Sequence, residues 1–196
     1  MSVNEVMTEI EKDTPFYRRS GGGVTATGGE PLMQADFTAE LLKHCRRKGI
    51  HTAVETCGYS TWNAFEKVLR YVDLVLYDIK HMDSAQHKKQ TRVGNEVILE
   101  NARKCAALGK EMIIRVPVVP GYNDSSESMK AIAEFARSLE GVEEVHLLPF
   151  HRLGESKYDR LGMRYSLKGV KGLDRESLAE QETLIASYDL RVQVGG

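Results

Sequence analysis

Short apolar runs alternate along the chain with longer stretches in which apolar residues recur at helical spacing. The short runs predict strands at residues 24–27, 51–55, 74–79, 112–119 and 145–148, with a further candidate at 191–194. The longer stretches predict helices at residues 37–48, 62–69, 97–108, 129–139 and 174–188. Alternation of this kind indicates an α/β fold built on a parallel sheet.

Five clear strands are too few to close an eight-stranded barrel. An open or partial barrel and a doubly wound sheet are both compatible with this order of elements. Residues 1–196 are expected to form a single domain, because 41% of the residues are hydrophobic and that content is sufficient for one core.

Polar and ionisable side chains follow the predicted strands. The carboxyl ends of parallel strands meet at one edge of a sheet, where α/β proteins bind their ligands. We therefore expect one site at this edge, formed by Gly28, Gly29, Glu30, Glu55, Asp78, Lys80, Arg115 and His151.

This mixture of acidic and basic groups suits a zwitterionic ligand with hydroxyl groups better than a polyphosphate. Gly28 and Gly29 lack a Cβ and allow a ligand to approach the backbone closely. A ribose diol is a suitable hydrogen-bond partner for Glu55. A carboxylate is a suitable partner for Arg115 or Lys80.

Each of these features also has a structural interpretation. Gly-Gly-Glu-Pro is an ordinary turn sequence. Arg115 is able to pair with a neighbouring carboxylate. Asp78 and Lys80 lie two residues apart and share one face of a strand, so they are expected to form an ion pair.

The cysteines and histidines give no metal-binding pattern. Cys45, Cys57 and Cys105 are odd in number and far apart, which favours a reducing compartment over disulfides. Cys57 has no identifiable base and is interpreted as a small buried residue. His81 and His87 suggest a metal site, but without a third ligand at suitable spacing they are interpreted as solvent-exposed helix positions.

Charge and hydropathy exclude several classes of protein. The 27 basic and 28 acidic residues give a net charge of −1, so we expect neither nucleic-acid nor membrane binding. No apolar run approaches the roughly 20 residues that span a bilayer. Residues 1–12 lack the apolar segment of a signal peptide. These observations predict a soluble, cytoplasmic protein.

Seven segments together carry a family resemblance. They lie at residues 16–24, 27–32, 49–52, 55–59 and 77–82, at 115–117 with 120–124, and at 147–154 with 156–158. With them the chain resembles the radical S-adenosylmethionine (SAM) enzymes that activate glycyl-radical enzymes, the group that contains pyruvate formate-lyase activating enzyme. The resemblance implies a partial (β/α)6 barrel and two cofactors, SAM and a [4Fe–4S] cluster.

The resemblance also implies roles for individual residues. Gly28, Gly29 and Glu30 match the family motif that receives the methionyl amino group of SAM. Glu55 matches an acidic residue near the ribose.

Other positions match further parts of the family site. Lys80, Arg115 and His151 match polar residues around the cofactor. Asp78, with Glu55 and Thr56 as further candidates, matches a site that holds a monovalent cation in some relatives.

The family's defining Cys-x3-Cys-x2-Cys loop, which ligates the cluster after the first strand, does not occur in this sequence. Cys45, Cys57 and Cys105 do not replace it. We therefore expect an N-terminally truncated partial barrel that lacks its first strand and cluster loop and is inactive alone.

For the full-length parent, the resemblance implies reductive cleavage of SAM followed by hydrogen abstraction from a glycine of a partner glycyl-radical enzyme. It also implies a reductant such as flavodoxin or ferredoxin. One alternative is a non-catalytic binding module that retains only cofactor or partner affinity. A second alternative is a small barrel enzyme with Lys80 as a Schiff-base nucleophile. Self-association is expected through the exposed edge at residues 24–26.

Overall fold

Six strands form one parallel sheet in the computed structural model, which describes residues 1–152, 160, 162, 165 and 167–195. The strands are β1 (Gly23–Ala26), β2 (His51–Thr56), β3 (Leu74–Asp78), β4 (Glu111–Val118), β5 (Glu144–Pro149) and β6 (Arg191–Val194). Each strand pairs with the next one along the chain, in the order β1 to β6. The candidate terminal strand at residues 191–194 is thus confirmed.

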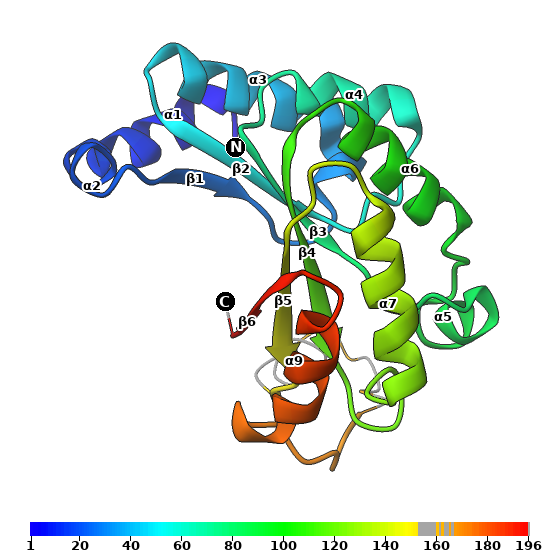
Figure 1. The fold of residues 1–196 in the computed structure, drawn as a ribbon. Coiled ribbons are helices and arrows are strands. Elements are labelled where there is room, and N and C mark those ends of the chain that lie inside the picture. The colour runs from blue at the N-terminus through cyan, green and yellow to red at the C-terminus, as the bar shows by residue number, and fades with distance from the viewer. Residues whose placement is uncertain (153–159, 161, 163–164, 166, 196) are drawn as a thin grey trace.

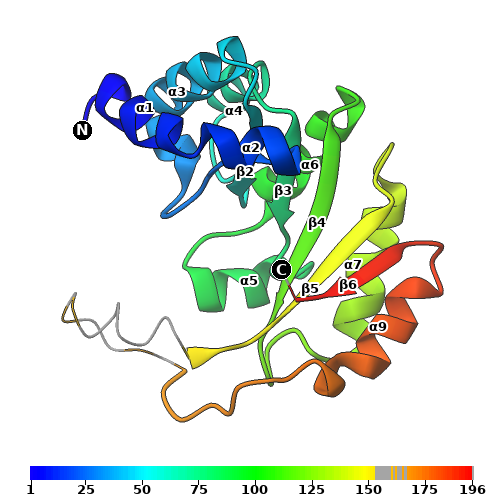
Figure 2. The ribbon, with the colours of Figure 1, turned by 90° about the vertical axis from the view of Figure 1, so that its left-hand side faces the viewer.

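The sheet is curved and open, and within the described residues β1 and β6 form its two unpaired edges (Figure 1). The connecting helices lie on its convex side. Figure 2 shows α7 (Ser126–Ser138) and α9 (Ala179–Ala186) together beside β5 and β6. Since helices cover only one face, the fold is a partial barrel rather than a doubly wound sheet.

The remaining helices follow the predicted order, which begins with a helix before the first strand, and α5 is an addition in the middle. They are α1 (Val3–Lys12), α2 (Thr14–Ser20), α3 (Ala35–Arg47), α4 (Trp62–Leu69), α5 (Ser84–Thr91) and α6 (Glu96–Ala107), with 3-10 turns at η1 (Pro31–Gln34) and η3 (Glu176–Leu178). The last predicted helix, at residues 174–188, is divided into η3 and α9. In the described part of the chain, no helix is both long enough and apolar enough to span a membrane.

The main core lies between the sheet and the helices on its convex side. Alternate residues of each strand point into it, and Val54, Tyr77, Ile114 and Leu147 are fully buried there. A smaller cluster, formed by Met7, Leu41, Cys45 and Ile50, packs α1 against α3. The opposite set of strand residues faces the concave side of the sheet, which leaves that side available for polar groups.

Helix α5 was not predicted, because its residues are polar on nearly every side. Its one buried residue is His87, which is 2% exposed and whose Nδ1 donates to the Val93 carbonyl at 2.8 Å. The interpretation of His87 as a solvent-exposed helix position is therefore wrong. The ring is buried because its hydrogen bond closes the loop after α5.

Candidate functional site

A pocket of about 270 Å³ lies at the carboxyl ends of β1, β2 and β3. Six of the eight predicted site residues line it, together with three neighbours: Gly28, Gly29, Glu30, Glu55, Asp78 and Lys80, with Thr27, Thr56 and Cys57. The parallel register brings these strand ends side by side. The sequence-predicted convergence at this edge is thus found in the structure.

Arg115 stands beside this pocket but does not line it. Its Nη1 lies 2.8 Å from Glu55 Oε2, and its Nε lies 3.9 Å from Asp78 Oδ1. The side chains of Arg115 and Asp78 are only 16% and 17% exposed. Arg115 therefore acts on the pocket through the two carboxylates, and its pairing with a nearby carboxylate is confirmed.

His151 lies outside the pocket lining. It is exposed and follows Phe150, whose amide donates to Val118 and whose carbonyl accepts from Leu173. The first of these bonds extends the pairing of β5 with β4 by one residue. The neighbouring resemblance segments at residues 153–154 and 156–158 lie outside the described residues.

Asp78 is the most unusual carboxylate of the pocket. Burial raises its pKa, and this effect outweighs the opposite influence of the nearby Lys80 and Arg115. Lys80 Nζ lies 3.2 Å from Asp78 Oδ2, which confirms the predicted ion pair. Within the described part of the molecule, Asp78 Oδ1 is buried and accepts no hydrogen bond. A ligand that donates to this oxygen would satisfy it.

The turn after β1 needs its glycine. Gly28 has a φ of +121°, a conformation that residues with a Cβ rarely adopt. Glu30, at the end of the turn, directs its carboxylate to Thr56 and Cys57 on the neighbouring strand. The turn therefore forms one side of the pocket, next to the ends of β2 and β3.

The sequence reasoning gave too little weight to three lining residues. The sequence places Thr27 only at the end of the predicted strand 24–27, and it suggests Thr56 only as a candidate for a cation site. Cys57 was interpreted as a small buried residue, whereas it lines the pocket and is partly exposed. Their position at the carboxyl ends of β1 and β2 is the signal that the sequence offers.

The cysteines lie in three separate places. Cys45 is buried in the small α1–α3 cluster, Cys105 is buried in the main core, and Cys57 lines the pocket. Burial raises the pKa of Cys105 to about 12. Among the described residues, His, Cys, Asp and Glu form no group of three or more that would hold a metal ion.

Comparison with known proteins gives consistent results. Residues 1–136 match the family model described as the Radical SAM superfamily. The chain is 45% identical over 190 residues to the (2S)-3-sulfopropanediol dehydratase activating enzyme of Klebsiella oxytoca, covering 96% of this chain and 60% of that protein. It is 46% identical over 187 residues to the isethionate sulfite-lyase activating enzyme of Nitratidesulfovibrio vulgaris. That match covers 94% of this chain and 60% of that protein.

A solved structure is similar over almost its whole length. It is a domain of pyruvate-formate lyase-activating enzyme from Bacteroides vulgatus, with a TM-score of 0.74 and 33% identity over 89% of this chain and 99% of that one. The chain belongs to the radical SAM superfamily. Within that superfamily, its resemblance to the activating enzymes of glycyl-radical enzymes is confirmed. It spans about 60% of the length of the two curated relatives.

The family implies SAM and a [4Fe–4S] cluster, and the pocket fits part of SAM. The free Asp78 Oδ1 is a suitable acceptor for an amino or hydroxyl group, and the Gly28–Gly29 backbone is open to close approach. Small-molecule pockets usually measure about 300–1,000 Å³. At about 270 Å³ the pocket has room for one end of SAM rather than the whole molecule.

The cysteines do not fit the cluster. Cluster binding needs several thiolates close together, whereas Cys45, Cys57 and Cys105 lie in separate surroundings. The described residues therefore form a pocket that fits part of SAM, but they form no cluster site.

Proposed function

We propose that this chain is the SAM-binding body of a glycyl-radical enzyme activating enzyme. The observation that carries the proposal is the pocket lined by both the Gly28–Glu30 turn and Asp78, whose buried Oδ1 accepts no hydrogen bond within the described residues. The identities of 45% and 46% with two activating enzymes support the same class of activity.

The pocket residues have complementary tasks in this proposal. The Gly28–Gly29 backbone and Asp78 receive the amino group of the methionyl end. Glu55 accepts hydrogen bonds from the ribose hydroxyls, and Lys80 attracts the carboxylate. Arg115 keeps Glu55 and Asp78 in position, because it lies near both.

The activity proposed for the whole enzyme is reductive cleavage of SAM, followed by hydrogen abstraction from a glycine of a glycyl-radical enzyme. A flavodoxin or ferredoxin would supply the electron. The cluster supplies the reducing centre when it is bound, and this chain's three cysteines do not form a site for it. We therefore propose that the 196-residue chain binds SAM without cleaving it.

The alternative of a non-catalytic binding module agrees with this proposal for the 196-residue chain, because a chain without a bound cluster would bind SAM but would not cleave it. The alternative of a Schiff-base enzyme is less favoured, because the radical SAM family model covers residues 1–136, a segment that includes Lys80.

Equilibrium dialysis with labelled SAM tests the proposal. We expect one SAM bound per chain, weaker binding by the Asp78→Asn variant, and unchanged binding by Lys130→Ala, a surface control on α7 whose side chain is 61% exposed. With dithionite added, we expect no 5′-deoxyadenosine. Absence of SAM binding by the unmodified chain contradicts the proposal, and formation of 5′-deoxyadenosine contradicts the part that concerns cleavage.

A further inference from the structure

The carboxylate of Glu30 is held by four hydrogen bonds from donors of this chain. Its Oε1 accepts from the Thr56 hydroxyl at 2.5 Å and from the Leu32 amide at 3.2 Å. Its Oε2 accepts from the Cys57 amide at 3.0 Å and from the Cys57 thiol at 3.1 Å. A carboxylate offers about four lone-pair positions, so these donors fill its capacity to accept hydrogen bonds.

The Cys57 thiol is in the protonated form that donation requires. Burial and then the negative charge of Glu30 raise the pKa of Cys57 to about 11. The group therefore remains a thiol at neutral pH and donates to the carboxylate. Its chemical role here is that of a hydrogen-bond donor rather than that of a nucleophile.

We call Glu30, Thr56 and Cys57 the Glu30 clasp. The clasp is anchored in the interior of the molecule: Thr56 is 2% exposed, and its hydroxyl also accepts from the Gly58 amide at 2.9 Å. The Gly58 carbonyl in turn accepts from the buried Asn101 amide group at 2.8 Å. A chain of hydrogen bonds thus connects helix α6 to the turn after β1, and linked bonds of this kind strengthen one another.

The clasp joins two parts of the pocket lining. Glu30 ends the turn that contains Gly28 and Gly29, while Thr56 is the last residue of β2 and Cys57 follows it. An amino group that took Glu30 as its partner would have to displace one of four protein donors. Asp78 also lines the pocket, and its Oδ1 accepts no hydrogen bond in the described part of the chain.

We infer that Thr56 and Cys57 are positioning residues of the SAM site, which they shape by holding Glu30. The inference rests on the proposed function and adds to it. Their side chains fix the Gly28–Gly29 turn at the distance from Asp78 that a bound amino group requires. The Glu30 carboxylate serves as the connection between the two strands.

Calorimetric titration of the chain with SAM tests the inference through matched variants. Cys57→Ser keeps a donor, and we expect an affinity within about twofold of the unmodified chain. Cys57→Ala and Thr56→Val each remove one donor to a charged acceptor, and we expect about tenfold weaker binding. Equal affinities of Cys57→Ser and Cys57→Ala would overturn the role of the thiol.

A double variant distinguishes positioning from direct binding. If Glu30 acts through Thr56, then Glu30→Gln combined with Thr56→Val binds SAM about as weakly as the weaker single variant, because both remove the same contact. If the double variant instead loses affinity by the product of the two single losses, Glu30 contributes to SAM binding independently of Thr56 and the inference is overturned. We expect 5′-methylthioadenosine, which lacks the amino-acid end, to bind all these variants about equally; parallel losses would indicate general damage and also overturn it.

Amide hydrogen exchange tests the clasp without any ligand. We expect Glu30→Gln to speed the exchange of the Cys57 and Leu32 amides, whose acceptor is weakened, and to leave the Asn101 region protected. Unchanged exchange at Cys57 overturns the clasp itself. Faster exchange in a chain that binds no SAM would support the clasp and contradict the proposed function, so the two failures are distinguishable.

Discussion

Arg115 on β4 reaches across β3 to place its Nη1 2.8 Å from the Glu55 carboxylate on β2. On the way it passes Asp78, its register partner on β3. One guanidinium thus serves two carboxylates from two different strands. The strand ends that form the candidate site are therefore connected by charge as well as by backbone pairing.

Removing the guanidinium tests this relationship. We expect Arg115→Ala to lower the free energy of unfolding by about 3 kcal/mol, because two poorly solvated carboxylates lose their partner. This loss of stability is at the lower end of the range expected when one partner of a buried ion pair is removed, since the Glu55 side chain is 31% exposed. Urea unfolding measures the change.

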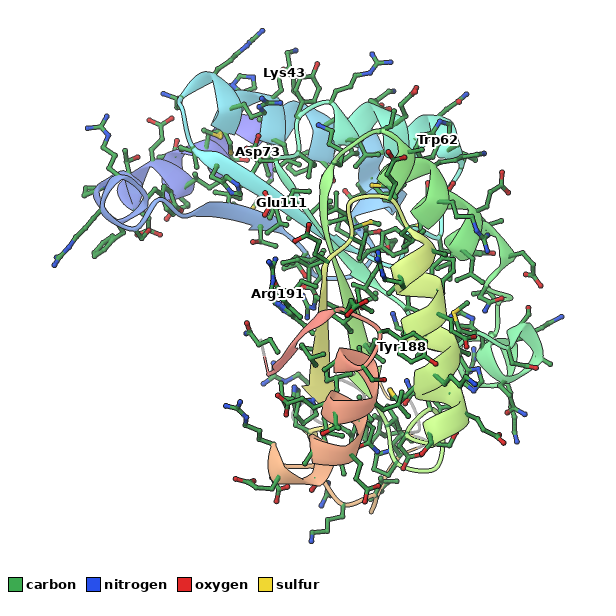
Figure 3. The ribbon with its side chains drawn as sticks, in the orientation of Figure 1. Lys43, Trp62, Asp73, Glu111, Tyr188 and Arg191 are labelled. Carbon is green, nitrogen blue, oxygen red and sulfur yellow. The ribbon has the colours of Figure 1, made fainter. Side chains whose placement is uncertain are left out.

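Arg191→Ala is the matched control for Arg115→Ala. Arg191 on β6 pairs with Glu143 and Glu144, but its side chain is 70% exposed. Figure 3 shows it on the concave side of the sheet. We expect a loss of about 0.5 kcal/mol or less. Similar losses for the two variants would contradict the importance assigned to the Glu55–Arg115–Asp78 contact.

Two glycines with similar backbone angles should respond differently to a methyl group. Gly58 and Gly49 have φ values of +69° and +70°. A Cβ at Gly58 would lie 1.9 Å from the buried Tyr77 hydroxyl, whereas a Cβ at Gly49 meets nothing within 4 Å. We expect Gly49→Ala to cost about 1 kcal/mol from the backbone alone. Gly58→Ala should cost about 3 kcal/mol, because overpacking is added. Equal losses in thermal unfolding would exclude the close contact with Tyr77.

Asp73 should give the protein a defined response to acid. It lies just before β3, at the end of the sheet away from the candidate site (Figure 3), and accepts from the Thr52 amide and hydroxyl at 2.9 Å each. Burial raises the pKa of Asp73, but the Thr52 bonds and Arg46 outweigh it, so the net shift is downward. A lowered pKa stabilises the fold above the unfolded-state value and loses that contribution as the pH falls through the folded-state value.

We therefore expect Asp73→Asn to be less stable than the unmodified chain by about 1 kcal/mol at neutral pH. The difference should shrink as the pH falls below about 4, the ordinary value for aspartate. Denaturant unfolding from pH 7 to pH 3 measures it. A difference that is independent of pH would show that the Asp73 charge contributes nothing.

The unpaired edge of β1 leads to an expectation about association. The strand Gly23–Ala26 carries no charged residue, and charge is one means by which edge strands avoid pairing with other chains. We expect the chain to self-associate in sedimentation velocity, and we expect Thr25→Lys, at an exposed position of this strand, to restore the monomer. A monodisperse monomer without the substitution would contradict this expectation.

Most of the sheet could be predicted from the sequence, because the strands contain short apolar runs and most are followed by polar residues. Helix α5 could not, since a helix with one buried residue has no apolar periodicity. The convergence of Gly28, Glu55 and Asp78 followed from parallel topology alone.

Finer relationships required the structure. The identity of the Arg115 partners depends on the register of β2, β3 and β4. The contact of Glu30 with Thr56 joins residues 26 positions apart, and no local pattern encodes it. The location of His151 outside the pocket lining is likewise not revealed by sequence spacing.

The central claim is that the turn at Gly28 and the free oxygen of Asp78 hold the amino-acid end of SAM. The most direct measurement compares calorimetric titrations of the unmodified chain and Gly28→Val with SAM and with 5′-methylthioadenosine. We expect the unmodified chain to bind SAM more tightly than the nucleoside, and we expect Gly28→Val to lose this preference because valine does not adopt a φ of +121°. No SAM binding, or an equal preference in both proteins, would contradict the account.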